Sequence, residues 1–153
     1  ARTPDLKTAP RGELRKLIED RSFGNQTLDG EVERSIKIFK ILASPSSEID
    51  EEKFEKEVIK NFNRSSNTEG FSRQLIAILA DKDRYDEVQT ITTPTLVIHG
   101  KLDPLIPYEE GKKTAELIPN SEFLGVDFMS HLIDKPVLDY IETPMVKFLD
   151  KNN

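Results

Sequence analysis

The feature that most constrains the fold is a change in the spacing of apolar residues near residue 90. Beyond it, TPTLVIHG at residues 93–100 is a short apolar run that is entered through a proline and closed by a glycine. Such a run is typical of a strand buried on both faces in a parallel sheet. SEFLGVDF at residues 121–128 predicts a second strand.

Helices are expected after each of these strands. The segment at residues 107–119 begins and ends at prolines and carries two glutamates near its start, which suits the helix dipole. The segment at residues 135–151 predicts a final helix. Its core-facing residues are expected to be Val137, Ile141, Val146 and Leu149. Strand, helix, strand and helix together predict a right-handed parallel α/β unit.

The first 90 residues have helical spacing instead. They predict about four amphipathic helices and no strand. These helices are expected near residues 11–20, 30–43, 51–62 and 71–83. Asp29 and Asp50 precede the second and third of them and are suitable N-caps.

The composition excludes several classes of function. The 153 residues carry a formal net charge of −6, which argues against nucleic acid or an anionic membrane as the main partner. There is no cysteine, so disulfides, thiol nucleophiles and cysteine-based metal sites are excluded. No apolar run approaches the roughly 20 residues of a membrane span. We expect a cytoplasmic protein that uses no cofactor and no metal.

Two polar residues follow the expected strands. Asp103 comes three residues after the first strand, and His131 comes about three residues after the second. Functional groups in open α/β sheets lie at the carboxyl ends of the strands, so these two side chains are expected at one edge. A carboxylate there can accept a hydrogen bond from one imidazole nitrogen and leave the other as a general base.

Each residue alone also has an ordinary structural interpretation. An aspartate after a strand is usually a turn residue, and a single histidine is usually structural. The matched positions at two strand ends favour a catalytic pair. His99, the other histidine, lies inside the first strand and is expected to be a core residue with a local hydrogen bond.

The same segments resemble a known family. PTLVIHGKLDPLIP, followed by GKKTAELIPNSEF and FMSHL, is similar to the C-terminal end of α/β-hydrolases over residues 86–150. The resemblance implies that Asp103 is the acid and His131 the base of a Ser-His-Asp triad. RQLIAILADKDRYDEVQTITTPT resembles the last cap helix of the esterase branch near the aclacinomycin methylesterases. It implies a helical cap at residues 1–90 and the C-terminal part of the hydrolase core at residues 91–153.

Two departures from the family pattern matter. Many relatives have Gly-x-Gly-His in the histidine loop, whereas this chain has Phe-Met-Ser-His at residues 128–131. The chain also contains no Gly-x-Ser-x-Gly elbow, which carries the nucleophile of the family. We therefore expect the N-terminal core strands and the serine to be absent from this chain. The strand at residues 95–98 would then need a neighbour on its second edge.

The sequence favours the C-terminal part of an α/β-hydrolase that acts on an ester or related acyl substrate. Leu105 and Leu132 flank the catalytic positions and are the expected substrate-binding residues. The expected partners are a small ester-type molecule and the N-terminal half of the hydrolase or a second copy of the chain. This chain alone is expected to be inactive. A non-catalytic interaction module derived from the fold is the alternative, and a receiver-like domain is disfavoured because only two strands are expected.

Overall fold

The computed structural model describes residues 12–20, 27–64, 68–80 and 84–153. Its elements are α1 (Gly12–Asp20), α2 (Leu28–Leu42), α3 (Glu51–Arg64), α4 (Thr68–Ala80), α5 (Tyr85–Gln89), β1 (Thr95–Gly100), α6 (Tyr108–Leu117), β2 (Ser121–Val126) and α7 (Lys135–Lys151). The predicted order of strand, helix, strand and helix is confirmed. Before it, the described part of the chain contains helices only, including the short α5 that the sequence did not predict.

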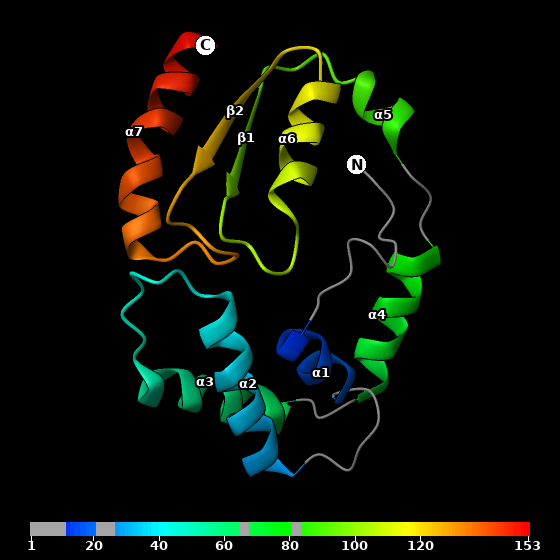
Figure 1. Cartoon of the computed structure of the whole chain (residues 1–153), viewed down its shortest axis with the longest axis vertical. Coiled ribbons are helices and arrows are strands. Elements are labelled where there is room, and N and C mark those ends of the chain that lie inside the picture. Colours follow the sequence, from blue (N-terminus) through cyan, green and yellow to red (C-terminus); the bar gives the residue numbers. More distant parts are fainter. Residues whose placement is uncertain (1–11, 21–26, 65–67, 81–83) are drawn as a thin grey trace.

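The two strands form a parallel sheet joined through α6. The register runs from Thr95 opposite Ser121 to Gly100 opposite Val126, so both strands end at the same edge. Figure 1 shows α1 to α4, here called the helical layer, beyond the carboxyl ends of the strands. The expected separation of the helices from the sheet faces is therefore seen. The domain boundary at residues 90 and 91 stays a prediction.

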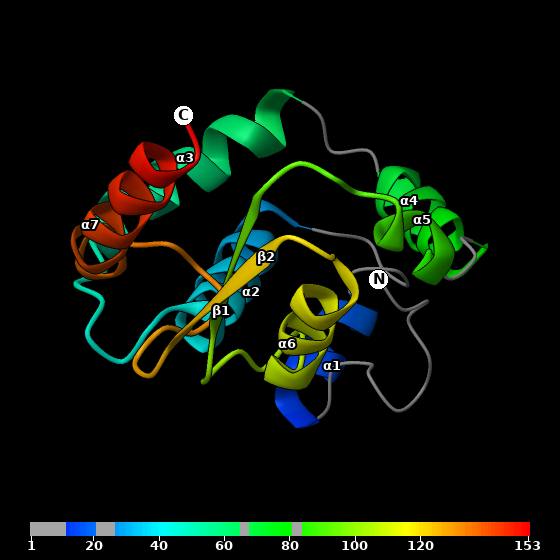
Figure 2. The same ribbon diagram turned by 90° about the horizontal axis from the view of Figure 1, so that it is seen from above.

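One face of the sheet packs against α7. Val137 and Ile141 of this helix are almost fully buried and form a cluster with Val126 and Met129. Ile98, Leu124 and Phe128 are partly buried against this cluster. Viewed from above, α7 and α6 lie on opposite sides of the sheet (Figure 2).

The other face is fitted to α6 by two contacts between a ring and a glycine. The ring of His99 occupies the space that a Cβ atom would need at Gly111 of α6. The ring of Tyr108 from α6 occupies the same kind of space at Gly125 of β2. Both glycines thus permit a close approach between helix and sheet.

The outer half of α7 differs from the prediction. Val146 and Leu149 are 49% and 56% exposed rather than in the core. At about 100° per residue, the nine residues from Val137 to Val146 turn the side chain to the opposite side of the helix. The inward stripe instead continues from Ile141 to the half-buried Pro144 and Phe148. The outward residues line a groove of about 360 Å³ with Leu138 and Met145, and Lys135, Asp139 and Glu142 complete its lining.

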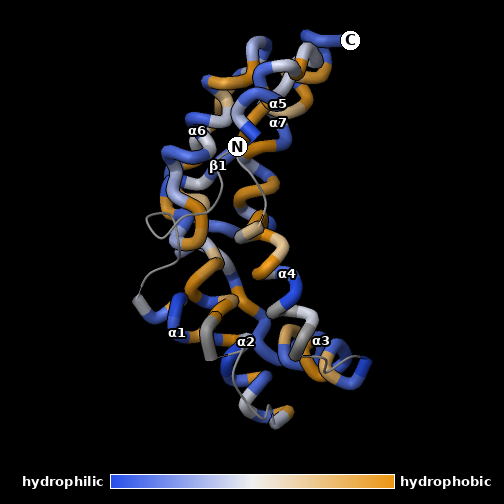
Figure 3. The backbone as a smooth tube through the Cα atoms, turned by 90° about the vertical axis from the view of Figure 1, so that its right-hand side faces the viewer, coloured by the Kyte–Doolittle hydropathy of each residue, from blue (hydrophilic) through white to orange (hydrophobic). Residues whose placement is uncertain are grey.

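The strands are also less covered than expected. The first five residues of each strand are half-buried or exposed, and only Gly100 and Val126 at their ends are buried. Each strand has a single neighbour within the described residues, so each has one open edge. The tube in Figure 3 shows hydrophobic stretches in the helical layer as well as in the part that holds the sheet.

Of the two predicted N-caps, Asp50 is confirmed and Asp29 is wrong. Asp50 caps α3, because its Oδ1 accepts a hydrogen bond of 2.9 Å from the Lys53 amide. The N-cap of α2 is Thr27 rather than Asp29: the Thr27 hydroxyl accepts from the Gly30 amide at 3.2 Å. Asp29 lies two residues further along, in the first turn, where its charge suits the helix dipole.

Candidate active site

Asp103 lies in the loop that follows β1, here called the acid loop (residues 101–106). Its side chain is 6% exposed. The Oδ1 atom accepts hydrogen bonds from the amides of Leu105 at 2.8 Å and Ile106 at 2.9 Å. These two bonds fix the carboxylate and turn its second oxygen, Oδ2, toward the neighbouring loop.

His131 lies in the loop between β2 and α7, here called the histidine loop (residues 127–134). Its Nδ1 is 2.9 Å from Oδ2 of Asp103, which confirms the predicted contact between the two side chains. A carboxylate can only accept, so Nδ1 carries the proton and Nε2 is the basic nitrogen. The side chain is 29% exposed, and Nε2 makes no hydrogen bond within the described residues. The ring is therefore available to a proton donor outside this pair.

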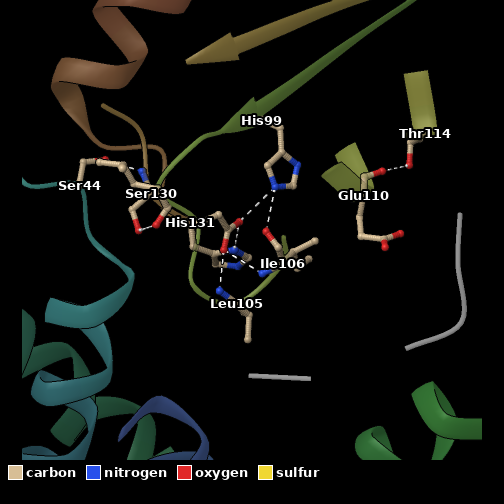
Figure 4. Close-up of polar contacts among 10 residues, drawn as sticks. Ser44, His99, Leu105, Ile106, Glu110, Thr114, Ser130 and His131 are labelled. Carbon is tan, nitrogen blue, oxygen red and sulfur yellow. Dashed lines mark hydrogen bonds and ion pairs between the residues drawn. The ribbon is translucent and has the colours of Figure 1, made fainter. Parts of the chain in front are cut away.

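His99 supports the acid loop from the other side. Its Nε2 lies 3.1 Å from the carbonyl oxygen of Ile106, so the ring has the local hydrogen bond that was predicted. The same nitrogen lies 3.6 Å from Oδ2 of Asp103, a proximity that the sequence reasoning missed. In Figure 4, His99 and His131 point toward the same loop.

The two loops are joined through their backbones at Gly100. A Cβ atom at this position would overlap the carbonyl oxygens of Met129 and Ser130. The Leu102 amide donates to Met129 O at 3.0 Å, and the Lys101 amide donates to the carbonyl of the last β2 residue at 3.0 Å. Gly100 therefore permits the close approach that brings Asp103 and His131 together.

The glycines that relatives have in the histidine loop are not needed for this backbone. Among the described residues, no residue other than glycine has a positive φ angle. Met129 and Ser130 thus adopt ordinary conformations for residues with side chains. Both are buried, at 6% and 3% exposure.

The predicted substrate-binding residues lie in the same two loops as the pair. Leu105 is half-buried in the acid loop and Leu132 in the histidine loop, and their substrate-binding role stays a prediction. In the described part of the chain, no cluster of three or more histidine, aspartate or glutamate side chains is suited to a metal ion. Within the same residues, no helix has the length and apolar character needed to span a membrane.

Known proteins resemble this chain over limited lengths. No protein-family model matches it. It is 38% identical over 56 residues to the pimeloyl-[acyl-carrier protein] methyl ester esterase of Vibrio cholerae, which covers 37% of this chain and 22% of that protein. It is 27% identical over 75 residues to a bifunctional esterase/perhydrolase of Acinetobacter calcoaceticus, which covers 48% of this chain and 27% of that protein.

Solved structures match nearly the whole chain. An esterase from Exiguobacterium antarcticum superposes with a TM-score of 0.64 and 21% identity, covering 90% of this chain and 47% of that one. A meta-cleavage product hydrolase from Pseudomonas fluorescens superposes with a TM-score of 0.68 and 17% identity, covering 95% of this chain and 54% of that one. An α/β-hydrolase from a deep-sea metagenome library of the Medee basin superposes with a TM-score of 0.59 and 18% identity, covering 94% of this chain and 53% of that one.

These structures define the fold. It is a part of the α/β-hydrolase fold, with two parallel strands and their helices, and the chain spans about half the length of the solved structures it matches. The similarity to the two curated esterases is limited to segments of 56 and 75 residues.

Proposed function

We propose that this chain supplies the helical cap and the C-terminal core of an α/β-hydrolase that cleaves an ester or related acyl substrate. Asp103 is the acid and His131 the general base. The observation that carries the proposal is the 2.9 Å contact from His131 Nδ1 to a carboxylate whose other oxygen is held by two backbone amides. The local similarity to two esterases supports an ester substrate.

The arrangement can perform the proton transfers of acyl transfer. His131 Nε2 accepts the hydroxyl proton of a serine as that oxygen bonds to the substrate carbonyl carbon, and Asp103 stabilises the imidazolium that results. The imidazolium then gives the proton to the leaving alcohol. Water then attacks the acyl-serine in the same way, with His131 again taking the proton. This step releases the carboxylic acid product and restores the serine.

The serine comes from outside these 153 residues. The chain has no Gly-x-Ser-x-Gly segment, and the open edge of β1 offers a place for a further strand. We propose that the N-terminal half of a hydrolase pairs there and brings the nucleophile and the oxyanion donors. A second copy of the chain is the alternative partner for this edge.

The proposed substrate site is next to the acid loop and the histidine loop, at the carboxyl ends of the two strands. Leu105 and Leu132 are the proposed contacts to the acyl or alcohol group. The resemblance of the last cap helix to the esterase branch near the aclacinomycin methylesterases favours a small ester. The missing elbow also favours a second function, a non-catalytic interaction module that kept the fold.

An esterase assay separates these functions. The chain alone should not hydrolyse a short activated ester above background, because it lacks the nucleophile and oxyanion donors. Mixed with an N-terminal part that supplies Gly-x-Ser-x-Gly, it should gain an activity that is lost in Asp103→Ala and His131→Ala. Asp127→Ala is the matched control, because Asp127 follows β2 but has a side chain that is 79% exposed. Activity that survives both site substitutions would show that the site is elsewhere, and no gain of activity would favour the interaction module.

A further inference from the structure

The end of α2 is hydrogen-bonded to the histidine loop at several points. The Leu42 carbonyl accepts from the amides of His131 at 3.0 Å and Leu132 at 3.2 Å. The Ser44 hydroxyl accepts from the Ser130 amide at 3.1 Å. These contacts join residues more than 85 positions apart in the sequence.

A further contact involves the start of α7. The Ser47 hydroxyl donates to Oδ2 of Asp134, and Oδ1 of Asp134 caps α7 by accepting from the Val137 amide at 3.0 Å. Residues 42–47, here called the clamp, thus hold the histidine loop on both sides of His131. Each bond uses a different residue pair, so the loop is fixed in position and in orientation.

The clamp also satisfies groups that would otherwise be unpaired. The last carbonyls of a helix have no partner within the helix. Leu42 closes α2, and the amides of the histidine loop take the place of the missing helical donors. Ser44 and Ser130 are 4% and 3% exposed, so water has little access to replace the bond between them.

Ser130 and its neighbour Met129 also connect the histidine loop to the acid loop. The Ser130 hydroxyl lies 3.4 Å from the carbonyl oxygen of Leu102, and the Leu102 amide bonds to Met129 at 3.0 Å. Figure 4 shows Ser44 beside Ser130, with His131 next along the loop. The position of the helical layer is therefore linked to the relative position of both members of the candidate pair.

We propose that the clamp is a positioning element for His131, with Ser44 as its main positioning residue. A displacement of α2 then moves the imidazole relative to Asp103. The base is therefore aligned only when the helical layer is in the position that lets the clamp bond to the histidine loop. This inference rests on the proposed function for its catalytic meaning. The structural link is independent of it and is tested first.

The test uses the fact that the 153-residue chain has only two histidines. Ring nitrogen and proton NMR spectra report both rings, and His99→Gln assigns them. In Ser44→Ala, the His131 ring signals should shift and its Nδ1 proton should exchange faster with water. The His99 signals should shift less, because His99 bonds to the Ile106 carbonyl and reaches the clamp only through the acid loop. Ser46→Ala, an exposed change within the clamp, should leave both rings unaffected.

Ser47→Ala provides a second variant and should shift His131 in the same way, because it frees Asp134 from the clamp. Unchanged His131 signals in both variants would overturn the proposal. Equal shifts of the two histidines would also overturn it, because they would indicate general loosening of the fold.

The complete hydrolase gives the catalytic readout. Ser44→Ala should lower kcat by about tenfold with little change in KM, because the base is misplaced while the binding surface is kept. Equal effects of Ser44→Ala and Ser46→Ala would contradict the proposal. A wrong assignment of the proposed function would give a different result. Activity would then survive His131→Ala, while the NMR result for the chain would still hold.

Discussion

Replacing Asp103 by asparagine tests how the carboxylate sets the state of His131. Oδ1 accepts from two backbone amides, and Oδ2 accepts from His131 Nδ1. Asparagine has only one acceptor oxygen. If that oxygen keeps the amides of Leu105 and Ile106, the NH₂ group faces His131. Nδ1 must then accept, and the ring proton moves to Nε2.

The expected loss follows from this change of tautomer. A histidine with a proton on Nε2 cannot take the proton of the serine, so turnover in the complete hydrolase should fall by about 10⁴. This corresponds to about 5 kcal/mol of transition-state stabilisation. The opposite orientation of the asparagine would leave two amides of the acid loop facing NH₂, which is the costlier arrangement.

Two measurements check the prediction. Ring nitrogen NMR of the chain should show the proton of His131 on Nδ1 in the native protein and on Nε2 in Asp103→Asn. The kcat of the complete hydrolase should fall in parallel. Asp127→Asn is the matched control: it replaces the carboxylate whose hydrogen bond and charge raise the pKa of the Lys101 ammonium, and it should leave the His131 tautomer unchanged. An Nδ1 proton that persists in Asp103→Asn would refute the reasoning, because another group would then orient the ring.

Two further changes test the packing. Gly100→Ala should destabilise the chain by about 3 kcal/mol in chemical denaturation, because its Cβ would overlap the carbonyls of Met129 and Ser130; an unchanged midpoint would show that the loops are not in contact there. Val137→Ala should cost about 2 kcal/mol and Val146→Ala within about 0.5 kcal/mol, since the first valine is fully buried and the second is 49% exposed. Equal losses for the two valines would contradict the assignment of the α7 faces.

The candidate pair could be predicted because its geometry is local to two strand ends. Gly100 and Val126 are opposite each other in the register, and Asp103 and His131 follow them by three and five residues. Parallel strands end at one edge, so the spacing was enough to predict that these side chains lie close together. The role of Gly100 had a weaker signal, a glycine at the end of an apolar run.

Other features left no periodic signal. The bonds of Ser44 and Leu42 to the histidine loop depend on how the helical layer sits over the sheet, and the sequence around Ser44 reads only as a turn between helices. On α7, apolar residues occur on more than one side. The sequence therefore did not distinguish the inward Phe148 from the outward Val146 and Leu149.

The two contacts between rings and glycines restrict how α6 can move and how the chain can vary. One ring projects from β1 to α6, and the other projects from α6 to β2. The helix cannot slide along the sheet unless one ring leaves its place. Positions 99 and 111 should therefore vary as a pair among relatives, and positions 108 and 125 as another. A side chain larger than glycine is expected at 111 or 125 only where the opposing ring has been replaced by something smaller.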